Sequence, residues 1–111
     1  MIHMLSVFNV EEGAEDFARA YAAFVKEVKD AGIVAGAGPL GRRVADTPMD
    51  TNAAWGQSLV SRMSFEDRAQ LDRAYAFIAE KSEPGASAHA RMYAQVRDAV
   101  FTCWEEPSDQ A

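Results

Sequence analysis

The chain has 111 residues, of which 49% are hydrophobic and 25% charged, and this size and composition predict one domain with its own core. The formal net charge is −6, which argues against the basic surface of a nucleic-acid binder and the Lys/Arg-rich face of a membrane-surface protein. With a single cysteine there is no intrachain disulfide, and the first ten residues lack a signal-peptide pattern, so we expect a cytoplasmic protein.

The first two predicted elements are a strand and a long helix. Residues 2–9 form a short apolar run with large side chains on both faces, which is typical of a strand covered on both sides. Residues 11–31 predict a helix, because apolar side chains recur with helical spacing at Phe17, Tyr21, Phe24 and Val28. Gly32 is the expected stop at its end.

Two further strands, residues 39–44 and 54–64, are predicted to form a hairpin around a long loop dense in turn formers. Residues 64–67 resemble a capping box and predict the start of a second long helix. A shorter helix over residues 87–97 and a last strand over residues 98–106 complete the predicted order.

The resulting order, β-α-β-β-α-(α)-β, predicts an α+β protein of the ferredoxin-like type, an antiparallel sheet with its helices on one face. We expect one domain over residues 1–106 and a tail over residues 107–111. The helices would leave the other face of the sheet with large apolar side chains in water, so we predict a homodimer that pairs the two sheets as a dimeric α/β barrel.

Several stretches resemble known families of this fold. The opening IHMLSVFNVEEG and the closing SAHARMYAQVRDAVFTCWEE resemble the dimeric α/β-barrel proteins, among them the stress-responsive A/B barrel proteins and the antibiotic-biosynthesis monooxygenases. The stretches LGRRVADTPMDTN and MSFEDRAQLDRAYAFIAE are similar to a family of short, uncharacterised bacterial proteins.

These resemblances imply two alternative sets of site residues. Polyketide cyclases of this type use one histidine on the first strand and another before the last strand, which would be His3 and His89. Haem-degrading monooxygenases of the same fold use an Asn, a Trp and a His, for which Asn9, Trp55 and His89 lie in comparable elements.

The residue pattern itself names further candidates for a pocket. His3 and His89 are the only imidazoles, which suits them to proton transfer if they line one pocket and otherwise leaves them structural. Tyr93 follows His89 by one helical turn, on the same helix face. The remaining candidates are core or pocket residues of the two long helices and aromatic residues of a ligand site or a dimer interface: Tyr21, Tyr75, Trp55 and Trp104.

Arg42 and Arg43 alternate along a strand, so one of them should be buried against a carboxylate, either of a substrate or of the last strand at Glu105 or Glu106. The acidic loop at residues 46–52 lacks the spacing of an EF-hand, and no other metal or phosphate motif occurs. We therefore expect no metal site and no cofactor.

Together these observations predict a homodimer that binds a small apolar or aromatic ligand. Such a protein would serve as a cofactor-independent isomerase, cyclase or monooxygenase that uses histidine acid/base chemistry. The first alternative is a non-catalytic ligand-binding or assembly module. The second is a haem-binding or haem-degrading protein.

Overall fold

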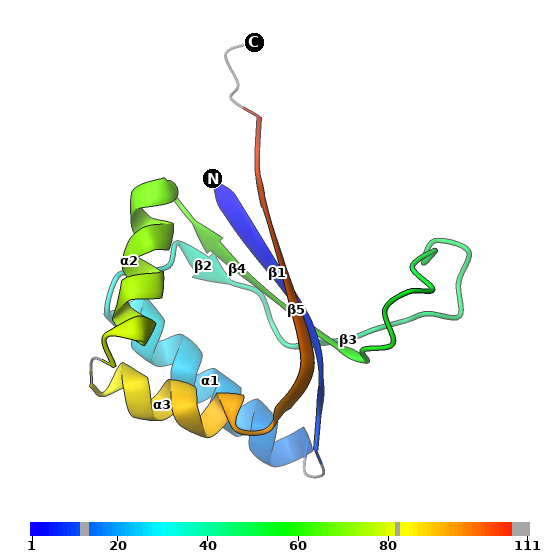
Figure 1. Cartoon of the computed structure of the whole chain (residues 1–111), viewed down its shortest axis with the longest axis horizontal. Coiled ribbons are helices and arrows are strands. Elements are labelled where there is room, and N and C mark those ends of the chain that lie inside the picture. The colour runs from blue at the N-terminus through cyan, green and yellow to red at the C-terminus, as the bar shows by residue number, and fades with distance from the viewer. Residues whose placement is uncertain (12–13, 82, 108–111) are drawn as a thin grey trace.

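The computed structural model describes residues 1–11, 14–81 and 83–107. Its elements follow one another as β1 (Ile2–Val10), α1 (Ala14–Asp30), β2 (Gly36–Ala37), β3 (Gly41–Arg42), β4 (Leu59–Phe65), α2 (Arg68–Ala79), α3 (Gly85–Tyr93) and β5 (Val96–Glu105). The strands form one antiparallel sheet in the order β2-β4-β1-β5, with β3 also paired to β4. All three helices lie on one side of this sheet (Figure 1). This is the predicted ferredoxin-like α+β fold.

The sheet has two distinct faces. The helix face carries alternate residues of the central strand, Ile2, Met4, Ser6, Phe8 and Val10, which lie opposite helix-face residues of β4 and β5. The far face carries the intervening residues, His3, Leu5, Val7 and Asn9. Because large apolar side chains occur on both faces, the strand pattern alone does not show which face packs against the helices.

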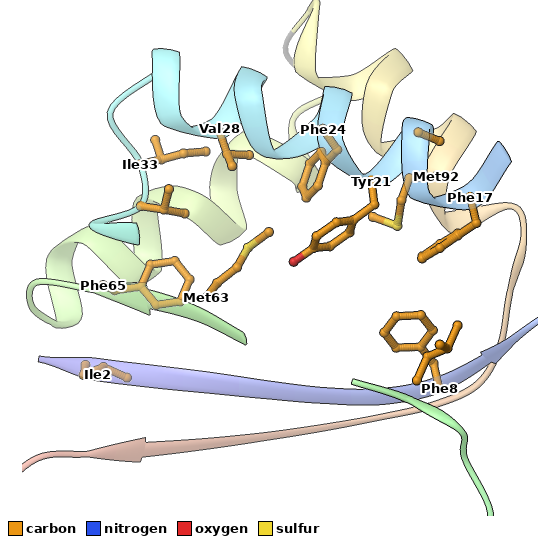
Figure 2. Packing of buried hydrophobic residues seen from close by; sticks show 13 residues of the cluster. Ile2, Phe8, Phe17, Tyr21, Phe24, Val28, Ile33, Met63, Phe65 and Met92 are labelled. Carbon is orange, nitrogen blue, oxygen red and sulfur yellow. The ribbon is translucent and has the colours of Figure 1, made fainter. Parts of the chain in front are cut away.

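The predicted stripe of α1 forms the centre of the core (Figure 2). Phe17 is fully buried, and each large side chain of this kind stabilises the fold by roughly 1.5–3 kcal/mol relative to exposure. The helix ends as predicted at Gly32, whose φ of +72° suits a residue without a Cβ. Ile33 N donates to Val28 O (3.2 Å) and Gly32 N to Lys29 O (3.0 Å), which is the Schellman pattern.

The second long helix begins three residues later than predicted. Asp67 is its N-cap and accepts a hydrogen bond from Gln70 N (2.8 Å), while Glu66 N donates to Oε1 of Gln70 (2.7 Å). The cap is therefore a variant of the capping box, in which Asp67 accepts from Gln70 N and the Gln70 side chain accepts from the residue before the N-cap, while Ser64 remains within β4.

The predicted hairpin is shorter than its sequence pattern suggested. The expected strand over residues 39–44 is reduced to β3, while β2 lies before it, and the second strand begins at Leu59 rather than Ala54. Residues 43–58 form a loop that projects on the side opposite the helices (Figure 1). Its ends are tied to the sheet because Arg43 N donates to Ser58 O (2.8 Å), and Ser58 N donates to Oδ1 of Asn9 (3.0 Å).

The third helix and the last strand lie close to their predicted places. The helix starts two residues earlier than expected and ends at Tyr93, and β5 begins at Val96 because its first residues pair with Val10 and Asn9 of β1. Of the predicted tail, residues 108–111 lie outside the described residues, as do residues 12–13 at the expected start of the first helix and residue 82 before the third.

Candidate functional site

A cavity of about 390 Å³ lies between the helices and the helix face of the sheet. Its floor comes from β4, β1 and β5, and its walls come from all three helices. Most of the lining is apolar or aromatic, with Met4, Phe8, Phe24, Met63, Phe65, Leu71, Ile78, Met92 and Phe101 among the contributing residues. Such a volume and lining are typical of sites for small molecules.

Three of the hydroxyl groups that line this mainly apolar space belong to buried residues. Ser6 and Ser61 are buried and lie directly opposite each other on β1 and β4, and Tyr21 reaches from α1 towards the sheet (Figure 2). Burial raises the pKa of the Tyr21 phenol, and the nearby Ser61 hydroxyl lowers it only in part. Among the described residues, none makes a hydrogen bond of normal geometry with the Tyr21 hydroxyl. We call these three residues the hydroxyl end of the cavity.

The imidazole of His89 forms part of the wall contributed by α3. Its ring centroid lies 5.2 Å from that of Phe24 and 5.3 Å from that of Tyr93, so the predicted neighbourhood of His89 and Tyr93 is present. Burial lowers the pKa of His89, which keeps the imidazole neutral at pH 7 and able to accept a proton.

Close packing fixes the position of α3. Gly85, at its first turn, lies so near α2 that a Cβ there would be 2.1 Å from Cε1 of Phe77. The cavity opens to solvent beside aromatic side chains, since Tyr75, Phe101 and Tyr93 are 77%, 51% and 38% exposed. Tyr21, Tyr75, His89 and Tyr93 are therefore the predicted site residues that the structure brings to one cavity.

His3 does not join them. It lies on the far face of the sheet, where Nδ1 is 2.7 Å from Oγ of Ser64 and Nε2 is 2.6 Å from Oε2 of Glu106. The expectation that His3 and His89 line one pocket is wrong for the single chain, because the sheet separates them.

The other predicted site residues also lie outside the cavity. Asn9 holds the ends of two segments together, since its amide bonds Ser58 N and Asp98 Oδ2. Arg42 is exposed at the sheet edge. Trp104 is on the far face, 44% exposed, with its ring centroid 5.3 Å from that of His3.

Trp55 belongs to the loop between β3 and β4, not to a strand. A second space of about 500 Å³ lies under this loop on the far face, lined by Trp55, Met49, Val7 and Val60 among others. The buried arginine is Arg43, and its carboxylate partner is Asp50 of the same loop rather than the last strand. Its guanidinium donates to both oxygens of Asp50 (2.7 and 2.8 Å), to Asn52 O (2.6 Å) and to Trp55 O.

The sequence analysis missed Ser6 and Ser61. Both interrupt an otherwise apolar alternation, Ile2/Met4/Ser6/Phe8 and Leu59/Ser61/Met63, and a serine at such a position marks a polar point on a buried face. In the described part of the chain, no group of three His, Cys, Asp or Glu residues is placed to hold a metal ion. No helix there is long and apolar enough to cross a membrane.

Comparison with known proteins places this geometry in context. The profile of a family of unknown function (DUF6614) matches residues 1–111. No curated protein matches by sequence. The Arabidopsis thaliana protein At3g17210 is similar in structure, with a TM-score of 0.72 and 10% identity over 100% of both chains.

Two bacterial structures share the same fold. A variant of SnoaB, a cofactor-independent oxygenase from Streptomyces nogalater, superposes with a TM-score of 0.69 and 12% identity over 98% of this chain and 95% of its own. A dimeric ferredoxin-like protein of unknown function from Jannaschia sp. CCS1 has a TM-score of 0.60 and 19% identity, with coverages of 95% and 98%. Antibiotic-biosynthesis monooxygenase-type proteins and dimeric ferredoxin-like proteins are thus among the chain's structural relatives, as the sequence resemblance implied.

Proposed function

The chain belongs to the family of unknown function DUF6614, and we propose that it binds a small, flat, mainly apolar molecule in the cavity between its helices and its sheet. The observation that carries this proposal is the buried hydroxyl of Tyr21 in a mainly apolar space of about 390 Å³, where among the described residues only the Ser61 hydroxyl lies near it and no hydrogen bond of normal geometry satisfies it. A buried polar group without a partner costs about 1–3 kcal/mol. A ligand that places one hydrogen-bonding group at the hydroxyl end would satisfy the Tyr21 hydroxyl and remove this unfavourable contribution to the free energy.

The chemistry that we propose for this site is proton transfer without a cofactor. His89 is neutral at pH 7 because burial lowers its pKa, and it lies beside Tyr93 in the cavity wall. An imidazole in that state takes a proton from an acidic C–H or O–H group of a bound substrate, and Tyr93 orients the substrate. Isomerisation, cyclisation and oxygenation of an electron-rich ring all begin with such a step. The fold shared with a cofactor-independent oxygenase supports this proposal only at the level of architecture.

Ligand binding is tested by a substitution that fills the cavity with a large side chain. Ala74, on α2, lines the cavity, whereas Ala79, on the same helix, is exposed. Calorimetric titration with 2-naphthol should show binding to the native protein and to Ala79→Trp, and none to Ala74→Trp. Equal binding to both tryptophan variants would place the ligand elsewhere and refute the proposal.

Catalysis and haem binding are separated by two further measurements. If His89→Gln turns over any substrate found as fast as the native protein does, His89 is not the catalytic base. If the native protein retains the ligand but turns over no substrate, the chain is a binding module. Haem is titrated under the same conditions. A Soret shift that Ala74→Trp abolishes, together with no binding of 2-naphthol, would replace this proposal with haem binding.

We also propose that the functional unit is a homodimer formed through the far face. The apolar centre of that face, beside the loop between β3 and β4, comprises the partly exposed Leu5 and Val60 and the buried Val7. Similar folds include a protein described as dimeric. Sedimentation should give about twice the 12.1 kDa mass of the chain, and Val60→Glu should give monomers. The exposed change Ala79→Glu is the control, and a monomeric native protein at micromolar concentration would contradict the dimer.

A further inference from the structure

A second group of reactive side chains lies on the far face, where β1 begins. Antiparallel pairing places Gly36, Ser64, His3 and Trp104 in one row across four strands. Residues that are directly opposite in such a sheet project to the same face. The row lies at one end of β1, and Leu5 and Val7, in the centre that we propose a second copy covers, lie further along the strand.

The hydrogen bonds within this row form a relay from a hydroxyl to a carboxylate. Oγ of Ser64 is 2.7 Å from Nδ1 of His3, and Oε2 of Glu106 is 2.6 Å from Nε2 of the same ring. When Nε2–H donates to Glu106, Nδ1 becomes the acceptor for the Ser64 hydroxyl proton. Nucleophile, base and orienting acid are then connected in the order that activated serines require.

The members of this relay differ in how far their side chains are exposed to solvent. The His3 side chain is only 15% exposed and is flanked by the Trp104 ring at 5.3 Å, so its orientation is restricted. The carboxylate of Glu106, which directly follows β5, is 55% exposed. An imidazole held between these groups keeps one nitrogen aimed at Ser64.

The side of Ser64 away from His3 has room, and a cationic side chain follows on the same face of the strand. Its neighbour Gly36 has no side chain, and a Cβ built there would meet no atom within 4 Å. Arg62, two residues before Ser64 on the same strand, projects to the same face and lies over Gly38, where a Cβ would be 3.8 Å from its Nε. Because Arg62 shares the face of Ser64, a guanidinium that swings towards the nucleophile would stabilise negative charge that develops on an attacked carbonyl oxygen.

We propose that Ser64, His3 and Glu106 form a second site, distinct from the cavity, which hydrolyses small aryl esters. Oγ of Ser64 attacks the carbonyl carbon while its proton passes to Nδ1 of His3, and Arg62 stabilises the oxyanion. The bond to the aryl oxygen breaks, His3 returns the proton to the departing phenol, and Ser64 is left acylated. Water, deprotonated by His3, then releases the carboxylic acid and restores the serine. Trp104, next to His3, provides a flat surface for the aryl group.

The test uses the full chain with p-nitrophenyl acetate. We expect release of p-nitrophenol with an early burst and an acetyl group on Ser64 by peptide mass spectrometry. Ser64→Ala should remove both, and His3→Gln should lower the acylation rate on the order of 10²-fold. Ser87→Ala, a serine on α3 away from this row, should retain the native rate.

Glu106→Gln separates a positioning role from a merely structural one. Glu106 is exposed at the end of the last strand, so the variant should fold, yet it should lower the rate and alter its pH profile by removing the charge that orients His3. An unchanged rate in folded Ser64→Ala, or acetyl groups on lysines alone, would overturn the proposal. Acetylation of Ser64 reports on this site and binding of 2-naphthol reports on the cavity, so failure here and failure of ligand binding in the cavity are independent outcomes.

Discussion

The hydroxyl of Tyr21, on α1, lies near the hydroxyl of Ser61, on β4, in the inner part of a mainly apolar cavity. The two groups are close enough for Ser61 to lower the pKa of the phenol in part, yet the Tyr21 hydroxyl makes no hydrogen bond of normal geometry within the described part of the chain. A polar group in this position is unfavourable in the empty protein and useful in the occupied one. The Tyr21 hydroxyl therefore lowers the stability of the ligand-free protein and increases its selectivity for ligands that carry a hydrogen-bonding group.

Tyr21→Phe should stabilise the ligand-free protein by about 1 kcal/mol, because it removes a buried hydroxyl that lacks a partner and keeps the ring that fills the core. Urea unfolding of both proteins measures the difference. A loss of more than about 1 kcal/mol would show that the hydroxyl is already satisfied in the empty cavity.

The free energy of unfolding should fall as the pH drops below the ordinary pKa of a histidine side chain, about 6.5. Burial lowers the pKa of His89, so the unfolded chain binds the proton more readily than the folded one, and acid favours unfolding. The neutral form contributes its stability above pH 6.5, and this contribution is lost as the pH falls through the folded-state pKa. His89→Gln should flatten this part of the urea-unfolding profile between pH 7 and 5, and an equally steep profile in the variant would exclude His89 as the cause.

Gly85→Ala should destabilise the fold by roughly 1–3 kcal/mol, because the new methyl group would overlap the Phe77 ring and displace α3. The movement carries His89 with it, so binding of 2-naphthol should weaken as well. The matched control is Gly56→Ala, where a Cβ meets no atom within 4 Å. Thermal unfolding that ranks the two variants equally would contradict the close packing of α2 and α3.

The loop between β3 and β4 should depend on Arg43 and not on Arg42. Arg43→Met removes the bonds to Asp50, Asn52 and Trp55, so chymotrypsin should cleave after Trp55 several-fold faster, whereas Arg42→Met should be cleaved like the native protein. The guanidinium of Arg43 lowers the pKa of Asp50 to about 2. The ion pair therefore supports the loop at all pH values above the ordinary carboxyl pKa and is lost only as the pH falls through about 2. Equal cleavage of both variants would show that the Arg43 network does not hold the loop.

Local patterns in the sequence were sufficient for the fold. The buried stripe of α1, its stop at Gly32 and the order of strands and helices follow from periodicity and turn chemistry, and the structure confirms them. The hairpin was less predictable. Its edge is divided between β2 and β3, and Trp55 leaves the strand because Arg43 and Asp50 organise a loop through contacts that no short-range pattern specifies.

The site could be predicted only in part. Tyr21, His89 and Tyr93 lie on helix faces whose inward direction follows from helical spacing, and all three line the cavity. The position of His3 could not be predicted in this way. Because β1 carries apolar side chains on both faces, its sequence does not show which face the helices cover. Each serine at the hydroxyl end interrupts the apolar alternation of its strand. The sequence does not show, however, that strand pairing places Ser6 directly opposite Ser61.

The most direct test compares two ligands of the same shape by calorimetric titration, 2-naphthol and 2-methylnaphthalene. The native protein should bind 2-naphthol more tightly by about tenfold, since one hydrogen bond to the Tyr21 hydroxyl contributes about 1 kcal/mol. Tyr21→Phe should bind both ligands equally, while Tyr75→Phe, altered at the exposed mouth, should retain the native preference. Equal affinities in the native protein, or no binding of either compound, would contradict a ligand site at this cavity.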